Sequence, residues 1–359
     1  MADVLMVSKA LAPPWNDSGK NLVRDLARGM TRHRPTLMVG DVDPGVPQAR
    51  LAHVYRGGVG FAPALSDQAR VFAHLLTARG ASLWHFFFAP NPRSCAAGGL
   101  AKRLRRKRTL HTISSAPREP RALVPLLFAD RNVVLSRHTE RRFLEAGLAP
   151  ERLARIAPAI EPLAPRQVAR ASLGLPASAP LVVYPGDLEF GEGAHLMIEA
   201  ARALPDVLFV MACRTKTASA REEERTLQRR IAAHGLGARF RFVGETARIH
   251  DLLATADVVA LPSRDLYAKM DYPLVLLEAM SLERAVIVAT DSAAAELTEG
   301  DAACAVDVKG EALAATLQRL LADDEARAQL GSAARARVLA QYSYTTMAAA
   351  YEALYDGLV

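Results

Sequence analysis

The feature that most constrains this fold is a repeated alternation of short apolar runs with longer helix-like segments. Five runs of strand length occur in the first half of the chain, at residues 4–7, 36–39, 83–87, 109–113 and 132–135. Five more occur in the second half, at residues 181–184, 207–212, 240–243, 258–261 and 285–289. Strands that alternate with helices are typical of a doubly wound parallel sheet. The sequence therefore predicts two similar Rossmann-like α/β domains in tandem.

A proline- and alanine-rich passage at residues 156–180 separates the two series of strands. At 359 residues, the chain is also longer than one ordinary hydrophobic core requires. We expect an N-terminal domain over residues 1–165, a C-terminal domain over 166–340, and a last helix over 341–359 that packs at the domain junction. Because ligands bind beyond the carboxyl ends of parallel strands, the two domains are expected to face a central ligand-binding cleft.

Composition argues against several classes of protein. The three cysteines, Cys95, Cys213 and Cys304, are far apart and lack the spacing of a metal site. No apolar run approaches the roughly 18 residues of a membrane span, and the initial Met-Ala-Asp leads into an apolar run without a charged leader. These observations predict a reduced, cytoplasmic protein that is not integral to a membrane.

The net charge of +7 is unevenly distributed along the chain. Residues 1–165 hold 25 basic and 12 acidic residues, whereas residues 166–359 hold 20 basic and 26 acidic residues. Much of the excess lies in KRLRRKR at residues 102–108. This run is either a solvated helix face or a surface for an anionic acceptor, an anionic membrane or nucleic acid. Nucleic acid is the weakest of the three functional readings, because no zinc spacing, aromatic RNA-binding signature or basic heptad pattern accompanies the charge.

The segment at residues 271–291 reads as the start of a helix, a buried helix and a buried strand. Pro273 suits the first helical position, and the N–H groups of the next residues, including Leu274 and Val275, favour an anion at the helix N-terminus. Glu278 lies one turn further on between apolar residues. Its carboxylate is expected either to bind hydroxyl groups or to pair with a neighbouring Lys or Arg.

A second helix start follows the first apolar run of the chain. Asp17 or Ser18 is a natural N-cap, Gly19 allows close approach of a ligand, and Lys20 would add a mobile cation to an anion site. The alternative is that Ser18 and Gly19 only form a turn.

A glycine-rich turn, PGDLEFGEG at residues 185–193, links a predicted strand to a helix. Gly186 is typical of a phosphate-binding turn, but Asp187 and Glu192 bring negative charge to it. A diphosphate there would need a compensating cation, for which Arg214 and Lys216 are the nearest candidates. The alternative is that the acids cap the helix and neutralise those cations.

The motifs PPWNDSGKNLVRDLA, SLGLP, YPGDLEFGEGAHLMIEA, FVGE, LLATADVVALPS, PLVLLEAM and AVIVATD occur in this order along most of the chain. In this the sequence resembles a GT-B glycosyltransferase of glycosyltransferase family 4. The resemblance implies an acceptor-side N-terminal domain and a C-terminal domain that binds a nucleotide-sugar donor. It also implies transfer of a hexose-type sugar to a hydroxyl with retention of configuration, without metal or cofactor.

The resemblance also implies roles for individual residues. Glu278 matches the glutamate expected to hold the donor's ribose hydroxyls, and the amides of Leu274 and Val275 match those expected at the donor phosphates. Gly19 matches the N-domain glycine that approaches the donor phosphate. The family's preceding acid, which binds the transferred sugar, falls at Met270 by strict spacing, and Asp271 is the nearby substitute.

The sharpest departure from the family lies in the glycine-rich turn. Family members usually carry Arg and Lys at the positions of Asp187 and Glu192, so both charges are reversed. We interpret the chain as a variant subfamily with an altered donor site, in which other side chains replace the lost positive charge. The candidates are Lys20, Arg214, Lys216 and Lys269.

In the family's retaining chemistry the leaving phosphate can itself accept the proton of the acceptor hydroxyl. His85 and His111 are the candidates for contacting the sugar or the acceptor, and Ser114 is an alternative to them. The acceptor is expected to be anionic or lipid-linked, with peripheral contact to the inner face of the membrane. Two other functions stay open: a GT-B binding or scaffold protein without turnover, and a nucleotide-sugar epimerase or hydrolase.

Overall fold

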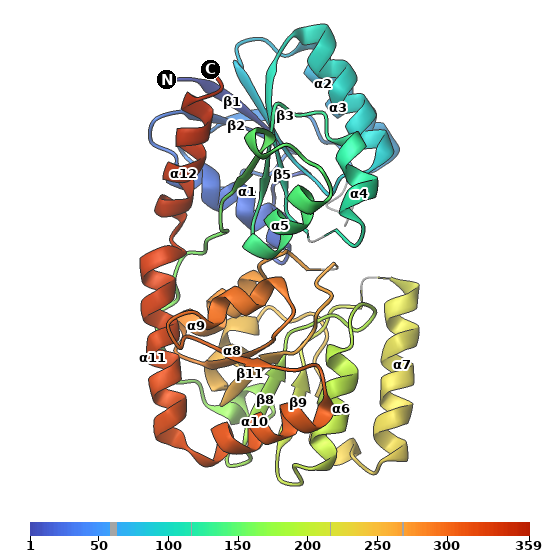
Figure 1. Ribbon diagram of the computed structural model, residues 1–359, viewed down its shortest axis with the longest axis vertical. Coiled ribbons are helices and arrows are strands. Elements are labelled where there is room, and N and C mark those ends of the chain that lie inside the picture. Colours follow the sequence, from blue (N-terminus) through green and yellow to red (C-terminus); the bar gives the residue numbers. More distant parts are fainter. Residues whose placement is uncertain (58–62, 116, 216, 268) are drawn as a thin grey trace. The chain divides into compact units, whose positions relative to one another are not determined.

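The computed structural model describes residues 1–359 apart from 58–62, 116, 216 and 268. The chain divides into two compact units (Figure 1). Unit 1 contains Met1–Glu161, Met270–Tyr272 and Tyr342–Val359, and unit 2 contains Pro162–Lys269 and Pro273–Gln341. The last helix of the chain therefore belongs to the same unit as the first strand.

Unit 1 is built on a seven-stranded parallel sheet with the strand order β3-β2-β1-β4-β5-β6-β7. All five strands predicted for this half are confirmed, whereas β3 and β7, the two edge strands, were not predicted. The strands are β1 (Asp3–Val7), β2 (Arg34–Val39), β3 (Arg50–His53), β4 (Leu83–Phe87), β5 (Arg108–Ile113), β6 (Arg131–Val134) and β7 (Leu153–Arg155).

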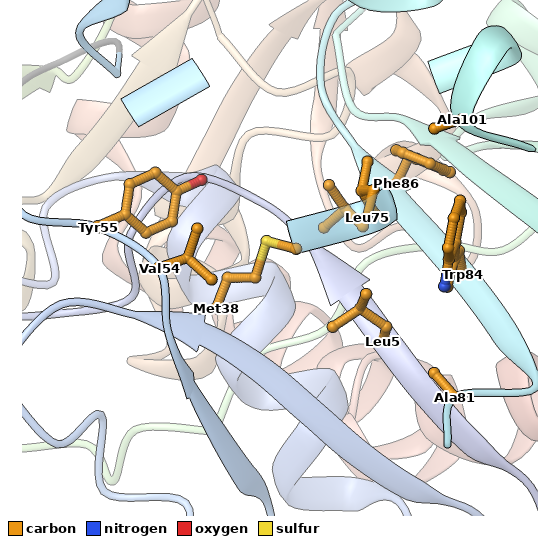
Figure 2. Packing of buried hydrophobic residues seen from close by; sticks show 10 residues of the cluster. Leu5, Met38, Val54, Tyr55, Leu75, Ala81, Trp84, Phe86 and Ala101 are labelled. Carbon is orange, nitrogen blue, oxygen red and sulfur yellow. The ribbon is translucent and has the colours of Figure 1, made fainter. Parts of the chain in front are cut away.

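Helices cover both faces of this sheet. Against one face, Met38 and Trp84 of the central strands pack with Leu75 and Ala101 of two neighbouring helices, α2 and α3 (Figure 2). Helices α1 and α12 pack together, and a Cβ atom at Gly29 would lie 2.5 Å from the carbonyl oxygen of Tyr344. The helices are α1 (Ser18–Gly29), α2 (Leu65–Thr77), α3 (Pro92–Arg105), α4 (Pro120–Leu123), α5 (Arg137–Glu145) and α12 (Tyr344–Asp356).

Unit 2 is built on a six-stranded parallel sheet with the order β10-β9-β8-β11-β12-β13. Its five predicted strands are confirmed, and the edge strand β13 was missed. The strands are β8 (Leu181–Tyr184), β9 (Leu208–Met211), β10 (Phe240–Phe242), β11 (Val258–Leu261), β12 (Ala285–Ala289) and β13 (Cys304–Val306). The helices are α6 (Gly193–Arg202), α7 (Ala218–Ala233), α8 (Ile249–Thr255), α9 (Leu274–Ser281), α10 (Gly310–Ala322) and α11 (Asp324–Gln341).

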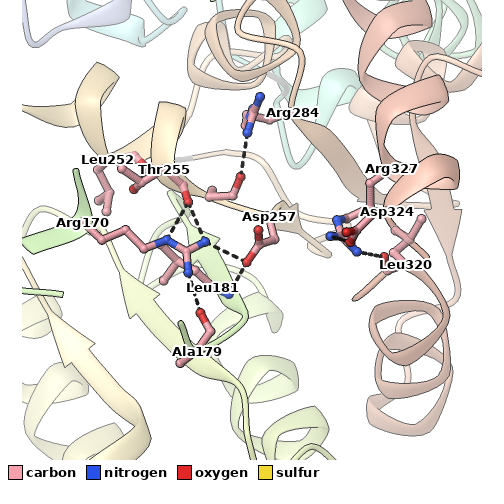
Figure 3. Close-up of polar contacts among 11 residues, drawn as sticks. Arg170, Ala179, Leu181, Leu252, Thr255, Asp257, Arg284, Leu320, Asp324 and Arg327 are labelled. Carbon is pink, nitrogen blue, oxygen red and sulfur yellow. Dashed lines mark hydrogen bonds and ion pairs between the residues drawn. The ribbon is translucent and has the colours of Figure 1, made fainter. Parts of the chain in front are cut away.

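Short 3₁₀ helices complete the secondary structure, at Val124–Leu126, Pro150–Arg152, Arg170–Leu173, Gly237–Arg239 and Ala293–Thr298. The one at Arg170 lies in the proline-rich passage and fixes the starts of two adjacent strands (Figure 3). The Arg170 guanidinium donates to the Thr255 carbonyl at 3.0 Å and to Asp257 Oδ2 at 2.9 Å, and the same Asp257 oxygen accepts the N–H of Leu181 at 2.7 Å. The start of β8 is thereby tied to the residue that precedes β11.

A buried carboxylate holds helix α12 to the strands of unit 1. Glu352 is 2% exposed, and its Oε1 accepts the backbone N–H groups of Thr31, Arg32 and His33 at 2.5 to 2.9 Å. These three residues form the approach to β2, so one oxygen joins the last helix to the second strand. Loss of this acceptor would leave several backbone donors without a partner.

We expect Glu352→Ala to lower the free energy of unfolding of unit 1 by about 2 to 4 kcal/mol, because up to three amides lose their acceptor. Glu352→Gln keeps a carbonyl oxygen at the same place and should cost about 1 kcal/mol. The tryptophans of this chain, Trp15 and Trp84, both lie in unit 1, so their fluorescence during urea unfolding reports on this unit. Equal losses in the two variants would contradict the role assigned to Oε1.

Candidate functional site in unit 2

The second sheet changes its direction of growth between β8 and β11. From β8 the chain adds β9 and β10 on one side, and it then returns to place β11, β12 and β13 on the other. In open parallel sheets, ligands bind beyond the carboxyl ends of the strands at such a switch point. Two segments of unit 2 emerge there: the β8–α6 loop, residues 185–192, and the β11 loop, whose described residues are 262–267 and 269.

These two loops are packed tightly against each other. A Cβ atom at Gly193 would lie 2.2 Å from the Ser263 hydroxyl oxygen, which is closer than real Cβ contacts allow. Gly191 has a φ of +77°, and a Cβ atom there would lie 2.9 Å from the carbonyl oxygen of Asp265. Glycine is needed at both positions for the two loops to approach each other.

Contacts among its own first residues stabilise the glycine-rich turn. A Cβ atom at Gly186 would lie 2.0 Å from the Tyr184 ring, and the Tyr184 hydroxyl donates to the Asp187 carbonyl at 2.8 Å. The Asp187 carboxylate accepts the N–H groups of Glu189 and Phe190 at 2.9 and 3.1 Å. Asp187 therefore closes the turn and does not cap helix α6.

Glu192 occupies the N-cap position of α6, but its side chain makes no capping hydrogen bond to the helix. Its Oε1 instead accepts Arg264 Nε at 3.2 Å and the Arg264 backbone N–H at 3.4 Å. Arg264 lies on the β11 loop and was not among the cations that the sequence suggested. The partner of Glu192 comes from the neighbouring loop at the switch point.

The predicted cations near the turn are only partly described. Burial lowers the pKa of the Lys269 ammonium and Arg214 adds to this effect, whereas the charges of Cys213 and Asp187 act in the opposite direction. Lys216 lies outside the described residues.

Helix α9 starts beside the same edge of the sheet. Pro273 is its N-cap, so the prediction that it is the first helical residue is wrong by one position. Leu274 and Val275 form the first turn, where backbone N–H groups have no acceptor inside the helix. Proline supplies no side-chain acceptor either, so the first turn of α9 is suited to an anion.

Glu278 is one turn into α9, and its side chain is 18% exposed. Its Oε2 lies 3.4 Å from Nε2 of His250, a half-exposed residue of α8, so the local partner is a histidine and not the expected Lys or Arg. The hydrogen bond to Glu278 raises the pKa of His250, burial opposes the rise, and the Glu278 charge adds to it. No sequence pattern marked His250, because its contact with Glu278 depends on the packing of α8 on α9.

Asp271 is fully buried and belongs to unit 1. Its two carboxylate oxygens accept the hydroxyls of Ser136 at 2.6 Å and Thr139 at 2.8 Å, at the N-terminus of α5. Its backbone N–H donates to the carbonyl of Ser114 at 2.8 Å. The predicted binding of the transferred sugar by Asp271 stays a prediction, and these contacts count against it.

Unit 1 has its own switch point between β1 and β4. Asp17 is confirmed as the N-cap of α1 and accepts the Lys20 N–H at 3.1 Å, and Gly19 lies in the same first turn. Lys20 is 3% exposed, and its ammonium donates to the carbonyls of Ala12 at 2.7 Å and Pro14 at 3.0 Å. The predicted role of Lys20 at the donor site stays a prediction, and these contacts count against a mobile ammonium, because they hold it in the β1–α1 loop.

The two predicted histidines are both fully buried in strands of unit 1. The ring nitrogens of His85 bond to the Tyr355 hydroxyl at 2.7 Å and the Thr112 hydroxyl at 2.8 Å. His111 Nε2 donates to the Phe88 carbonyl at 2.9 Å, and burial lowers the pKa of His111 to about 4. The predicted contact of either side chain with a sugar or an acceptor stays a prediction, and the burial of both imidazoles counts against it.

Some residues of the basic run at 102–108 make structural contacts within unit 1. Lys102 pairs with Asp130 at 2.7 Å, and Arg105 donates to the carbonyl of Ala78 at 3.0 Å. On the outer face of α3, however, Leu100 and Leu104 are 51% and 62% exposed. In the described part of the chain, no helix combines the length and apolar character needed to cross a bilayer.

The pair formed by His250 and Glu278 predicts a specific titration. Because the pKa of folded His250 is raised above 6.5, the pair stabilises the protein fully below pH 6.5, and this contribution is lost as the pH rises through the folded pKa. We expect Glu278→Gln to lower the His250 pKa, as followed by nuclear magnetic resonance, with the signal assigned by its loss in His250→Gln. Glu311→Gln, at an exposed helix start, is the control. An unchanged His250 pKa in Glu278→Gln would contradict the pairing.

Comparison with known proteins places the candidate site within a recognised domain. Residues 165–337 match the family model described as "Glycosyl transferases group 1". The chain is 30% identical over 199 residues to the D-inositol 3-phosphate glycosyltransferase of Corynebacterium urealyticum, a match that covers 53% of this chain and 46% of that protein. The chain thus spans about half the length of the curated relatives that it matches.

Solved structures resemble the chain over its whole length. HepE of Anabaena in complex with UDP and glucose superposes with a TM-score of 0.80 at 20% identity, over 100% of both chains. Its complex with UDP-glucose gives a TM-score of 0.79 at the same identity and coverage. Sucrose-phosphate synthase of Thermosynechococcus elongatus gives a TM-score of 0.80 at 20% identity over 100% of this chain and 99% of that one. The fold is therefore that of GT-B glycosyltransferases, with two Rossmann-like parallel-sheet domains, and residues 165–337 match the group 1 glycosyltransferase family.

Proposed function

We propose that the chain is a glycosyltransferase that moves a hexose-type sugar from a nucleoside diphosphate donor to an acceptor hydroxyl, with retention of configuration and without a metal ion. The observation that carries this proposal is the start of α9 beside the switch point of unit 2. The Leu274 and Val275 amides there are suited to phosphate oxygens, and Glu278 follows one turn later with a partly exposed carboxylate. The group 1 match and the UDP complexes of HepE support this assignment.

Glu278 has the chemistry that ribose hydroxyls require. An ionised carboxylate accepts hydrogen bonds from two neighbouring hydroxyls, and it is partly exposed at 18%. Among the described residues, the ion pair with His250 uses Oε2, so we assign Oε1 to a ligand hydroxyl. We assign the phosphate role to the first turn of α9 and the ribose role to Glu278.

The chemical step needs no nucleophile from the protein in this proposal. The departing phosphate accepts the proton of the acceptor hydroxyl, and the site contributes by stabilising negative charge on the nucleotide. This mechanism also fits the burial of His85 and His111, since neither has to act as a general base. Metal independence is tested by turnover in the presence of a chelator, and retention by the anomeric configuration of the product.

We expect Glu278→Ala to reduce kcat/KM for the donor by roughly 10- to 100-fold, because hydrogen bonds to a charged group contribute about 1.5 to 3 kcal/mol. Glu311→Ala changes an exposed glutamate in the first turn of α10 and should alter kcat/KM less than twofold. The measurement is release of nucleoside diphosphate from UDP-, GDP- and ADP-linked sugars with an acceptor panel that includes D-inositol 3-phosphate.

The same panel separates the alternative functions. Donor binding by calorimetry without release of nucleoside diphosphate would favour a GT-B binding protein, for which the reversed charges of Asp187 and Glu192 are the specific observation. Conversion or hydrolysis of the donor without an acceptor would favour an epimerase or hydrolase. The absence of any nucleotide binding would contradict all three proposals.

A lipid-linked or anionic acceptor is proposed from the outer face of α3. Leu100 and Leu104 are one turn apart and exposed, and seven basic residues but no acidic residue occur between 92 and 108. Exposed leucines beside arginines favour an anionic bilayer over nucleic acid, which would gain little from the leucines.

We expect the protein to float with phosphatidylcholine vesicles that contain phosphatidylglycerol at low salt, and to be released as salt screens the attraction. Leu100→Ser with Leu104→Ser should weaken this binding by roughly tenfold, because each CH₂ group buried in the bilayer contributes about 0.8 kcal/mol. Leu339→Ser changes a comparably exposed leucine in unit 2 and serves as the control. If all variants bound the vesicles equally, or if the wild type did not bind them, the proposed membrane contact would be contradicted and α3 would be an ordinary solvated helix.

A further inference from the structure

We propose that Arg264 and Lys269, both on the β11 loop, supply the positive charge that meets the donor's diphosphate. This inference rests on the proposed function and names two binding residues of that site. It assigns the cationic role to a loop different from the glycine-rich turn that carries Asp187 and Glu192.

The charges at the switch point are divided between the two loops. The β8–α6 loop carries three carboxylates and no basic residue between 185 and 193, whereas the β11 loop carries Arg264 and Lys269 against one acid, Asp265. Three acids facing a diphosphate would repel it unless cations lay beside them. Arg264 and Lys269 of the adjacent loop can supply this positive charge.

Arg264 is held at a defined place on this edge of the sheet. Its Nε and its backbone N–H both contact Glu192, which is the N-cap of α6. The loop that carries it is locked to the glycine-rich turn by the close contact of Gly193 with Ser263. The rings of Phe190 and Tyr267 add a T-shaped contact between the same loops, with 5.7 Å between centroids.

The pair with Glu192 leaves Arg264 available to a ligand. The side chains are 55% and 35% exposed, so solvent screens their attraction and little is lost when a stronger anion competes. The contact uses Nε, whereas a guanidinium carries four further N–H donors on its two terminal nitrogens. Such a fork matches the geometry of phosphate oxygens.

Lys269 adds a second cation on the same loop. It is partly buried, and its backbone N–H donates to the carbonyl of Leu266 at 2.9 Å, so it is fixed on the same loop as Arg264. A partly buried ammonium is only weakly screened, so it attracts a phosphate more strongly than an exposed lysine would. The two cations together offset the carboxylates of the turn.

The test compares UDP with UMP, because the two nucleotides differ by the second phosphate. Calorimetry should show that Arg264→Gln weakens UDP binding by about tenfold and UMP binding by less than twofold. Lys269→Met should act in the same direction. Glu192→Gln, which removes the competing carboxylate, should leave UDP binding unchanged or make it tighter.

Arg225→Gln is the matched control, because Arg225 is an exposed arginine of α7 that also pairs with a glutamate, Glu222. Circular dichroism melting confirms that each variant is folded. If the wild type bound UDP and both Arg264→Gln and Lys269→Met kept its ratio of UDP to UMP affinity, this inference would be overturned. The proposed function would not be affected. If the wild type bound none of UDP, GDP and ADP, the proposed function itself would fail, and this inference with it.

Discussion

The adjacency of β8 and β11 is the constraint on which the candidate site depends. These two strands are paired in register, with Val182 opposite Val258, and their starts share the Asp257 carboxylate. Their carboxyl ends therefore open side by side, and the loops that follow must pack against each other. Gly191 and Gly193 allow that contact, so glycines that suggest a phosphate loop in the sequence act first to bring two segments of the protein together.

The sequence could predict the fold because the central strands of the second sheet form continuous buried runs and those of the first sheet are largely buried. Residues of β8, β11 and β12 are all buried, so the runs stand out from the helices between them. The strands that were missed, β3, β7 and β13, lie at sheet edges and are three or four residues long. Edge strands are partly exposed, as in the pattern of β3, and a short run with exposed residues carries little hydrophobic signal.

The candidate site was less predictable, because its partners are fixed by tertiary contacts. The start of α9 and Glu278 could be read locally, since a proline, a first turn and an isolated acid follow one another in sequence. His250 and Arg264 could not, because each meets its acid from another element of unit 2. Asp271 likewise appeared as a possible ligand acid, whereas its carboxylate accepts two hydroxyls at the start of α5.

Burial distinguishes the cations that can bind a ligand from those whose hydrogen bonds already stabilise the fold. Lys20 is 3% exposed and donates to two carbonyls, and hydrogen bonds to charged groups contribute about 1.5 to 3 kcal/mol each. A diphosphate that drew this ammonium away would leave those carbonyls buried without a donor. An exposed ion pair such as that of Arg264 contributes about 0 to 1 kcal/mol, so an incoming phosphate meets little resistance there. The difference of a few kcal/mol favours the β11 loop over Lys20 as the source of positive charge for the donor.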